Sequence, residues 1–209
     1  MGLYVQYGCG FDAPEEWLNF DVSPTLRFER IPILGMLYTK NKQRFPKNVR
    51  YGNIVKGLPV IQSGTCDGIY CSHVLEHLSF EDFITALKNT FKYLKPGGIF
   101  RCVIPDLKGY VEIYLERIKH KDSTASIQFM RETRLGTEKR VYGIWNLFKF
   151  LGSHEHLWMW DALSLQDYLR RTGFSQIRPC LFNDSSDPMF NMVESEKRFR
   201  NAIAFEAIK

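Results

Sequence analysis

Short stretches of alternating apolar and polar residues recur along the chain, and each one stops at glycine, proline or a short polar residue. An alternation with a period of two residues is typical of a β-strand. The first stretch, Leu3–Tyr7, ends at the turn formed by residues 8–10. We expect six further strands, over residues 17–21, 48–54, 66–71, 99–104, 174–182 and 201–208.

Two segments between these strands show apolar residues at helical spacing instead. Ser79 is the predicted N-cap of the first helix, with Asp82 at its third position, and the Pro-Gly-Gly run of residues 96–98 is expected to stop it. The second helix covers residues 164–172 and closes at Gly173. Strands that alternate with helices favour an α/β fold with a mostly parallel sheet, which ends here in an antiparallel-looking pair.

Residues 107–161 carry a helical pattern in which aromatic side chains stand among arginines and lysines. Aromatic rings stack on sugars, and Arg131, Arg134 and Arg140 could bind phosphate. A helical lid with a core of its own is the simpler explanation for most of these aromatic residues.

The turn Gly8-Cys9-Gly10 lets backbone approach a ligand closely, because two of its residues lack a Cβ atom. In an open parallel sheet, cofactors lie in the crevice outside the carboxyl ends of the strands. Asp21 closes the second strand, where it can accept hydrogen bonds from both hydroxyl groups of a ribose. The two pieces indicate a nucleoside-type site. A dinucleotide site is disfavoured, because Ala13 replaces the third glycine and the acid follows too soon.

A length of 209 residues fits one domain with an additional segment, and the apolar fraction of 44% is ordinary for a globular protein. No apolar run approaches the length of a membrane span, and the early first strand leaves no room for a signal peptide. The five cysteines form no CxxC pair, so we expect reduced, buried thiols and a cytoplasmic protein. With a net charge of +5, the protein could accept an anionic substrate, but this charge does not favour a nucleic-acid partner.

Five motifs together resemble those of the class I S-adenosylmethionine-dependent methyltransferases: YGCG, Asp21, GNIVKGLP, CDGIYCSHVLEHL and LKPGG. The resemblance implies S-adenosylmethionine as cofactor. It also implies a Rossmann-like, mostly parallel seven-stranded sheet with an antiparallel last strand and a helical insertion after the fifth strand. Residues 1–106 would then form the cofactor-binding half of the α/β core, 107–161 the helical insertion or substrate lid, and 162–209 the C-terminal completion of the same core.

Within this superfamily, SHVLEHL, LKPGG, VIPDL and AFEAIK resemble predicted small-molecule methyltransferases of polysaccharide and sugar modification. The chain departs from the family at Gln6, where an acid is common, and in its first helix, which must be stunted or absent because Asp21 follows so soon. No helix precedes the first strand, so substrate recognition should fall to the insertion.

The resemblance assigns cofactor binding to residues at and beyond the ends of four predicted strands. They are Tyr7, Gly8, Cys9, Gly10, Asp21, Asn53, Ile54, Ser72 and His73.

Methyl transfer from a sulfonium depends mainly on in-line placement of the acceptor, and only a hydroxyl acceptor needs a base. His73 follows the fourth strand, and its imidazole titrates in the right range for this role. His154 and His156, near the end of the insertion, are predicted to converge with it on the acceptor. A hydrogen-bonded strand-end histidine that touches cofactor remains the alternative for His73. Asp106 is either a further candidate base or a helix N-cap.

The spacing His73-x-x-Glu76-His77, followed by the His-Glu-His run of residues 154–156, also resembles a metal-binding pattern. It is that of metal-dependent small-RNA and quinone-biosynthesis O-methyltransferases, where an acid takes the place of His73. The implied ligands of a divalent ion are Glu76 and His77 with His73 and His156, and the imidazole would favour a softer metal than magnesium. Helix capping and packing explain Glu76 and His77 about as well as catalysis does, so a metal is possible but not expected.

The leading prediction is an S-adenosylmethionine-dependent methyltransferase that acts on oxygen of a small polar acceptor, such as a sugar or glycoconjugate precursor. A catalytically inactive cofactor-binding or partner-binding protein on the same fold is the first alternative, motivated by Gln6 and the shortened loop. An NAD-dependent oxidoreductase is the second alternative.

Overall fold

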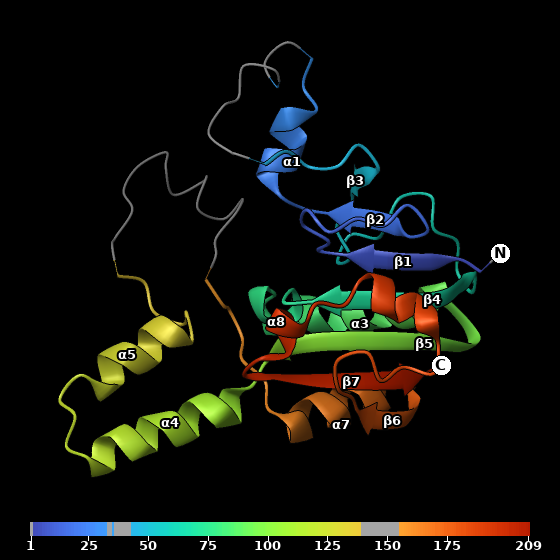
Figure 1. Ribbon diagram of the computed structural model, residues 1–209. Helices are drawn as coiled ribbons and strands as arrows, with labels where there is room; N and C mark the ends of the chain where they lie inside the picture. The colour runs from blue at the N-terminus through green and yellow to red at the C-terminus, as the bar shows by residue number, and fades with distance from the viewer. Residues whose placement is uncertain (1, 33–34, 36–42, 139–154) are drawn as a thin grey trace.

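The computed structural model describes residues 2–32, 35, 43–138 and 155–209. A seven-stranded sheet forms its centre, in the order β3-β2-β1-β4-β5-β7-β6 (Figure 1). Neighbouring strands from β3 to β5 are parallel, whereas β7 runs antiparallel to both β5 and β6, which confirms the predicted fold class. The strands are β1 Tyr4–Tyr7, β2 Leu18–Asp21, β3 Val49–Tyr51, β4 Cys66–Ser72, β5 Leu94–Pro105, β6 Ser175–Pro179 and β7 Ala202–Ile208.

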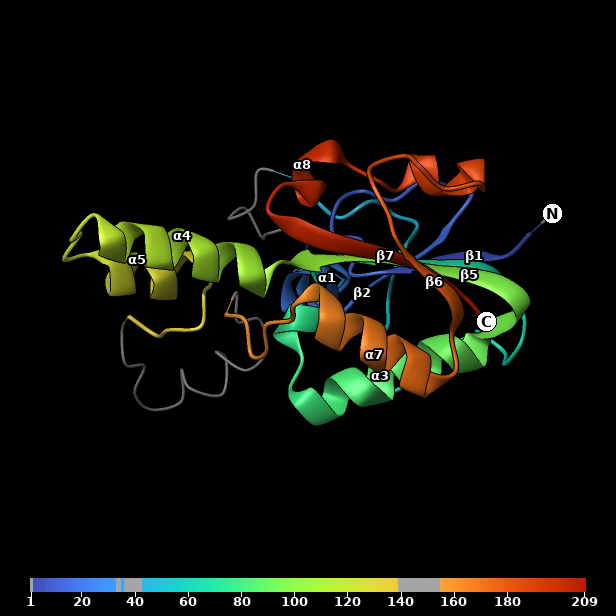
Figure 2. The same cartoon turned by 90° about the horizontal axis from the view of Figure 1, so that it is seen from below.

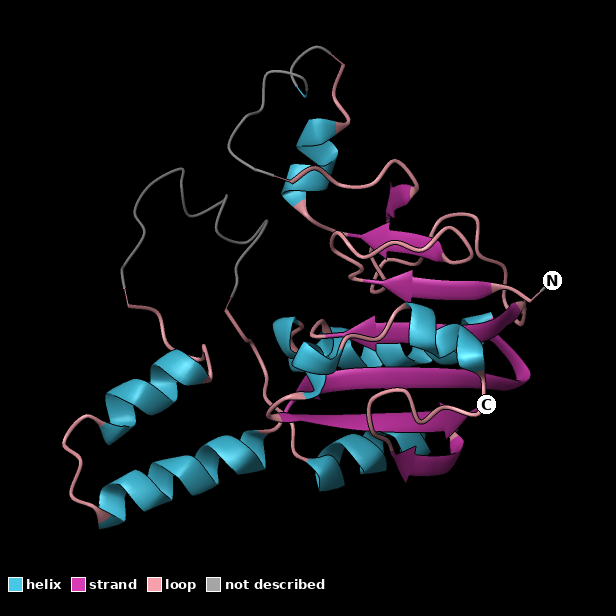
Figure 3. Ribbon diagram, viewed as in Figure 1, coloured by secondary structure: helices cyan, strands magenta, loops and turns pink. Residues whose placement is uncertain are grey.

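Helices and short 3₁₀ turns occupy connections between the strands (Figure 3). The predicted caps are present, since Ser79 Oγ accepts from Asp82 N at 3.2 Å and Gly173 ends its helix with a φ of 114°. Asp106 is an N-cap and accepts from Lys108 N at 3.0 Å. The helical elements are α1 Pro24–Glu29, η1 Leu75–His77, α3 Phe80–Tyr93, α4 Leu107–Lys119, α5 Ala125–Glu132, α7 Ala162–Thr172, η2 Pro188–Met192 and α8 Glu196–Phe199.

The predicted stop at residues 96–98 lies inside a strand, because β5 already starts at Leu94. Cys66 of β4 pairs with Leu94 of β5, and Gly68 pairs with Ile99, so β5 has more residues than β4 between these two pairs. The extra residues bulge from the ladder, and Gly97 supplies the required positive φ of 78°. The turn chemistry therefore shapes the start of the strand rather than separating it from the helix.

Helices α3 and α7 cover one face of the sheet (Figure 2). Phe83 and Leu87 of α3 and Leu165 and Leu169 of α7 are fully buried in the main core. Residues 8–17, all of which the structure describes, contain no helix, as the short distance to Asp21 predicted. The opposite face therefore needs another cover.

The chain between β6 and β7 provides that cover (Figure 2). In a doubly wound sheet, right-handed crossovers place the β1–β2 helix on the face opposite α3. Here η2 brings the fully buried Phe190 to that face, in a cluster with Trp17, Tyr70 and Val103. The sequence pattern predicted no helical element between residues 182 and 201 and so missed both η2 and α8.

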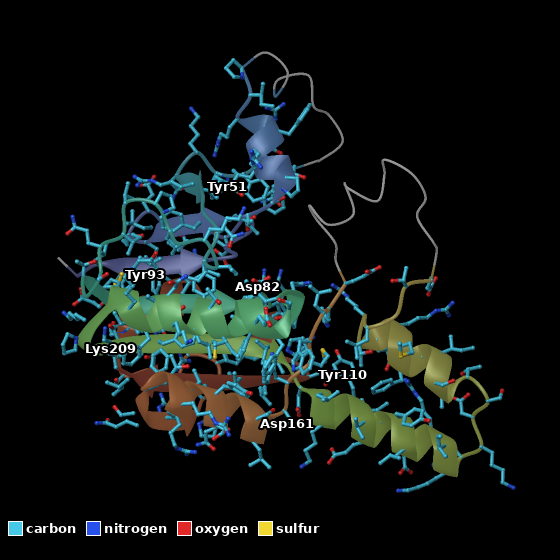
Figure 4. The ribbon with its side chains drawn as sticks, turned by 180° about the vertical axis from the view of Figure 1, so that it is seen from behind. Tyr51, Asp82, Tyr93, Tyr110, Asp161 and Lys209 are labelled. Atoms are coloured by element: carbon cyan, nitrogen blue, oxygen red, sulfur yellow. The ribbon has the colours of Figure 1, made fainter. Side chains whose placement is uncertain are left out.

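Helices α4 and α5 project past the carboxyl-terminal ends of the parallel strands (Figure 1). Arg117 donates to both carboxylate oxygens of Glu132, at 3.0 and 2.7 Å, and the rings of Tyr114 and Phe129 lie 5.4 Å apart. Figure 4 shows Tyr110 of α4 at the end of the sheet where the parallel strands terminate. Residues 139–154 of the expected insertion, including Arg140, lie outside the described residues. The division at 106 and 161, and a lid role, stay predictions.

The five cysteines all lie in described stretches, where each is buried and free. Burial raises the pKa of the Cys66 thiol to about 11, so it stays protonated at neutral pH. Of the helices that the structure describes, none combines the length and apolar character required to cross a bilayer.

Candidate functional site

The glycine turn lies where the strand order reverses, between β1 and β4. Gly8 N donates to Phe20 O at 2.8 Å, which ties the turn to β2. Gly8 has a φ of 71°, and a Cβ atom there would lie 2.1 Å from Val74 Cγ2. Gly10 also has a positive φ, of 57°, but no described atom lies within 4 Å of an added Cβ. Close packing requires the first glycine, and the backbone conformation favours the second.

Asp21 ends β2 beside this turn and is nearly buried. Its Oδ2 accepts from Gly10 N at 2.9 Å, and its Oδ1 accepts from Ser23 N at 2.7 Å. Each oxygen of an ionised carboxylate has a further lone pair. The side chain therefore orders the glycine turn and retains acceptor capacity for a ligand hydroxyl group.

The chain after β3 continues this edge, since Gly52 N donates to Asp21 O at 3.1 Å. Asn53 Oδ1 accepts from Val55 N at 2.8 Å and so closes a local turn. Ile54 is buried in the main core, and its carbonyl accepts from Asn89 Nδ2 at 2.7 Å. These contacts hold the segment next to the glycine turn but occupy the side-chain oxygen of Asn53.

Two of the predicted cofactor residues direct their side chains into the protein. The Tyr7 hydroxyl lies 3.2 Å from Thr90 Oγ1, and complete burial holds its pKa well above the usual range. Cys9 is buried with Leu26 and Phe45. Tyr7 and Cys9 can therefore contribute to a ligand site mainly through their backbone.

A small pocket of about 10 Å³ lies between the glycine turn, the end of β4 and the C-terminal segment. Arg198, which sequence reasoning missed, enters it from α8 and donates through Nη1 to Ser72 O at 3.1 Å. No motif marks this arginine, because it reaches the site only through the fold of the β6–β7 connection. The lining residues are Gln6, Tyr7, Gly8, Cys9, Asp12, Tyr70, Ser72, Val193 and Arg198.

His73 follows β4 directly and has a φ of 55°, a conformation that costs a residue with a side chain about 1–3 kcal/mol. Its Nε2 lies 2.8 Å from Arg198 O, and its Nδ1 lies 3.3 Å from Glu76 Oε1. The imidazole therefore links the pocket to a buried carboxylate, and both ring nitrogens have contacts in this state.

The end of the insertion packs against η1, the short turn that carries Glu76. Leu157 N and Trp158 N donate to Glu76 O at 2.8 and 3.1 Å. This brings the ring of His156 to within 4.9 Å of the His77 ring, centroid to centroid. Burial lowers the pKa of His156 to about 4, so its imidazole is neutral at physiological pH. His154, the other predicted catalytic histidine of this run, lies outside the described residues.

One candidate ligand atom from each of Glu76, His77 and His156 lies within 4.8 Å of the others. His73, the fourth member of the predicted metal set, is not in this trio but touches the carboxylate of Glu76.

Trp160, near the end of the insertion, is a core residue, because it is buried and its ring stacks on that of Phe83, with the centroids 4.0 Å apart.

Known proteins match both the sequence pattern and the fold. The model of a methyltransferase-domain family matches residues 8–178. The structure of an S-adenosylmethionine-dependent methyltransferase from Archaeoglobus fulgidus aligns with a TM-score of 0.52 at 14% identity, over the whole chain and 86% of that protein. One from Thermotoga maritima, described as a possible histamine N-methyltransferase, aligns with a TM-score of 0.50 at 17% identity, over the whole chain and 83% of that protein. A search of curated proteins found no match.

The sheet order and the glycine turn at its switch point define a class I methyltransferase fold. The chain belongs to the methyltransferase-domain family, whose model covers most of its length. It therefore carries an S-adenosylmethionine-dependent methyltransferase domain, and this class replaces the NAD-dependent alternative.

Proposed function

We propose that the protein transfers the methyl group to an oxygen of a small polar acceptor, such as a sugar or glycoconjugate precursor. The contact between His73 Nδ1 and Glu76 Oε1 at the end of β4, at 3.3 Å, carries the oxygen assignment. An imidazole supported by a buried carboxylate is suited to take a proton from a hydroxyl group. The aromatic and basic insertion remains the expected site of acceptor recognition.

The turn after β1 fits the cofactor of the family, because the space above Gly10 is open to a ligand. S-Adenosylmethionine supplies an electrophilic sulfonium methyl group when it is bound. Asp21 would accept from the ribose hydroxyl groups with its remaining lone pairs. The other proposed binding groups are the backbones of Tyr7, Gly8, Cys9 and Gly10, the segment Asn53–Ile54, and Ser72 with His73.

Arg198 adds a cation to the proposed cofactor site. A guanidinium pairs well with a carboxylate, so we assign it to the carboxylate of the methionine moiety. The present pocket, of about 10 Å³, has room for about one water molecule, so the segment that carries Arg198 must shift when cofactor enters. Because Arg198 O also holds His73 Nε2, the same shift would free the imidazole to act as a base.

An inactive cofactor-binding or partner-binding protein is the second candidate. The specific observation in its favour is that His73 has a contact at each ring nitrogen, with Arg198 O and with Glu76 Oε1. Without a shift of the C-terminal segment, this imidazole has no nitrogen available for a substrate proton.

The test uses the purified chain, cofactor with a labelled methyl group, and a panel of sugars, sugar phosphates, amines and carbon acceptors. We expect labelled product from hydroxyl acceptors, and calorimetry should show cofactor binding. Asp21→Ala should weaken that binding by about tenfold or more, because hydrogen bonds to a charged group are lost. Asp67→Ala is the matched control, since Asp67 lies at the opposite end of β4.

Transfer to nitrogen or carbon alone would overturn the oxygen assignment. Binding without turnover on any acceptor would favour the inactive candidate. If cofactor does not bind, or if Asp21→Ala binds it as the wild type does, the proposed cofactor site is wrong.

A further inference from the structure

Three buried side-chain atoms, two on η1 and one near the end of the insertion, lack the hydrogen bond that a buried polar atom normally has. Within the described part of the chain, Glu76 Oε1, Glu76 Oε2 and His156 Nδ1 make no hydrogen bond. The exposed fraction is 1% for Glu76 and 7% for His156. Leaving such groups unpaired is destabilising, most of all for a charged group. Their burial together therefore points to a positive partner in addition to the His73 ring, whose Nδ1 lies 3.3 Å from Glu76 Oε1.

The geometry suits a metal ion. The candidate ligand atoms of Glu76, His77 and His156 lie within 4.8 Å of one another. Two ligands at about 2.0–2.2 Å from one ion are at most roughly 4.4 Å apart. Small side-chain adjustments would therefore bring the three atoms into contact with a common ion.

The two imidazoles are oriented for coordination by main-chain contacts. His77 Nδ1 lies 2.9 Å from Glu155 O, which leaves Nε2 as its ligand atom. The His156 ring forms a hydrogen bond with the Thr133 backbone, which leaves the buried Nδ1 as its ligand atom. A hydrogen bond from the distal nitrogen to a carbonyl fixes the tautomer and the ring orientation of a metal-binding histidine.

We propose that Glu76, His77 and His156 bind one divalent transition-metal ion of the zinc class. Two imidazoles and one carboxylate favour such an ion over Mg²⁺, which prefers oxygen ligands. The three protein ligands leave a coordination position for water or another oxygen ligand. The ion would also join the end of the insertion, residues 155–158, to the turn η1, beside the hydrogen bonds from Leu157 and Trp158 to Glu76 O.

The proposal goes beyond methyl transfer and does not depend on it. A competing account is that the His73 ring, whose Nδ1 lies 3.3 Å from Glu76 Oε1, is the only partner of that carboxylate. That account requires no ion and no role for His77 or His156.

The experiment titrates the purified, chelator-treated 209-residue chain with Zn²⁺, Co²⁺ and Mg²⁺, by calorimetry and by the visible spectrum of the Co²⁺ form. We expect one Zn²⁺ or Co²⁺ per chain and much weaker binding of Mg²⁺. Glu76→Gln and His156→Gln should each weaken Zn²⁺ binding by more than about tenfold. His120→Gln is the matched control, because His120 is an exposed imidazole 3.2 Å from Glu116 Oε1, and it should bind Zn²⁺ as the wild type does.

Circular dichroism without metal checks that each variant is folded. If His156→Gln unfolds, the nearly isosteric Glu76→Gln still provides the test. The proposal is overturned if the wild type binds neither Zn²⁺ nor Co²⁺, if Mg²⁺ binds more tightly, or if both folded variants retain wild-type affinity. Cofactor affinity of the metal-free chain, measured separately, reports on the proposed function. Its failure would leave the metal result unaffected.

Discussion

Gln6 shows how one buried side chain can stabilise a loop that replaces a helix. Its Nε2 donates to Asp12 O at 2.8 Å and to Asn19 Oδ1 at 2.6 Å. Asn19 Nδ2 in turn donates to Pro14 O and Trp17 O, each at 2.8 Å. An amide meets this pattern because it offers two N–H donors, whereas the acid common in the family offers none when ionised.

Gln6→Glu should therefore lower the free energy of unfolding by about 2 kcal/mol or more, because a charged carboxylate would face two acceptor oxygens in a buried site. Urea denaturation at neutral pH measures the change. Gln62→Glu, at an exposed position, is the control and should be close to neutral. Equal stability of the two variants would show that the Gln6 amide does not hold the loop.

The connection between β6 and β7 performs the structural role of the absent helix. Phe190 of η2 is fully buried, with its ring centroid 5.5 Å from that of Trp17 and 6.4 Å from that of Tyr4. The same connection carries Arg198 into the proposed cofactor pocket. Packing of this one segment therefore couples the stability of the sheet to the shape of the site.

We expect Phe190→Ala to lower the free energy of unfolding by about 3–5 kcal/mol, the range for removing a buried aromatic side chain. Phe182→Ala should cost less, because Phe182 belongs to the same connection but is 38% exposed. Chemical denaturation of both variants provides the comparison. Similar losses would indicate that Phe190 of η2 does not stabilise its cluster with Trp17, Tyr70 and Val103.

A network of charges joins β5, β6, β7 and the C-terminal connection into one unit. Arg101 has no exposed surface and binds Glu194 Oε1 through Nε at 2.7 Å, and Glu206 and Asp184 through Nη1. Arg178 binds the last two carboxylates from β6. Such a buried network specifies how these elements meet, because an unpaired charge there would be costly.

This network predicts acid-sensitive stability. Burial tends to raise the pKa values of Asp184 and Glu206, but hydrogen bonds outweigh burial and hold the two pKa values below their usual 3.8 and 4.5. The main hydrogen-bond partner of Asp184 is Arg178. For Glu206 the main partners are Ser185 and then Arg101. A depressed folded-state pKa gives stability that is present above the unfolded value and lost as the pH falls through the folded value.

The free energy of unfolding should therefore decrease as the pH falls below about 4.5. Glu194 acts in the opposite direction and at higher pH: burial raises its pKa above 4.5, so its protonation adds stability as the pH falls toward about 4.5. Urea denaturation between about pH 3 and 6 measures the slope, which Asp184→Asn should reduce, because its side chain no longer titrates. An unchanged slope in this variant would exclude Asp184 as a contributor.

Local sequence patterns were sufficient for much of the fold. Alternation located the strands, and the caps Ser79 and Gly173 marked helix ends, because these signals depend on neighbours within a few residues. The motifs around Asp21 indicated the methyltransferase class that the family match shows. Local patterns did not predict the bulge at residues 94–99, since register depends on the partner strand.

Tertiary packing alone decided how the site is assembled. Arg198 meets His73 across 125 positions of the chain, and His156 reaches Glu76 only because the last part of the insertion forms hydrogen bonds to the η1 turn. Packing also turned the Tyr7 side chain into the core. Sequence periodicity reports which residues prefer burial or a turn, but contacts between distant segments depend on the packing of the whole chain, which no local pattern contains.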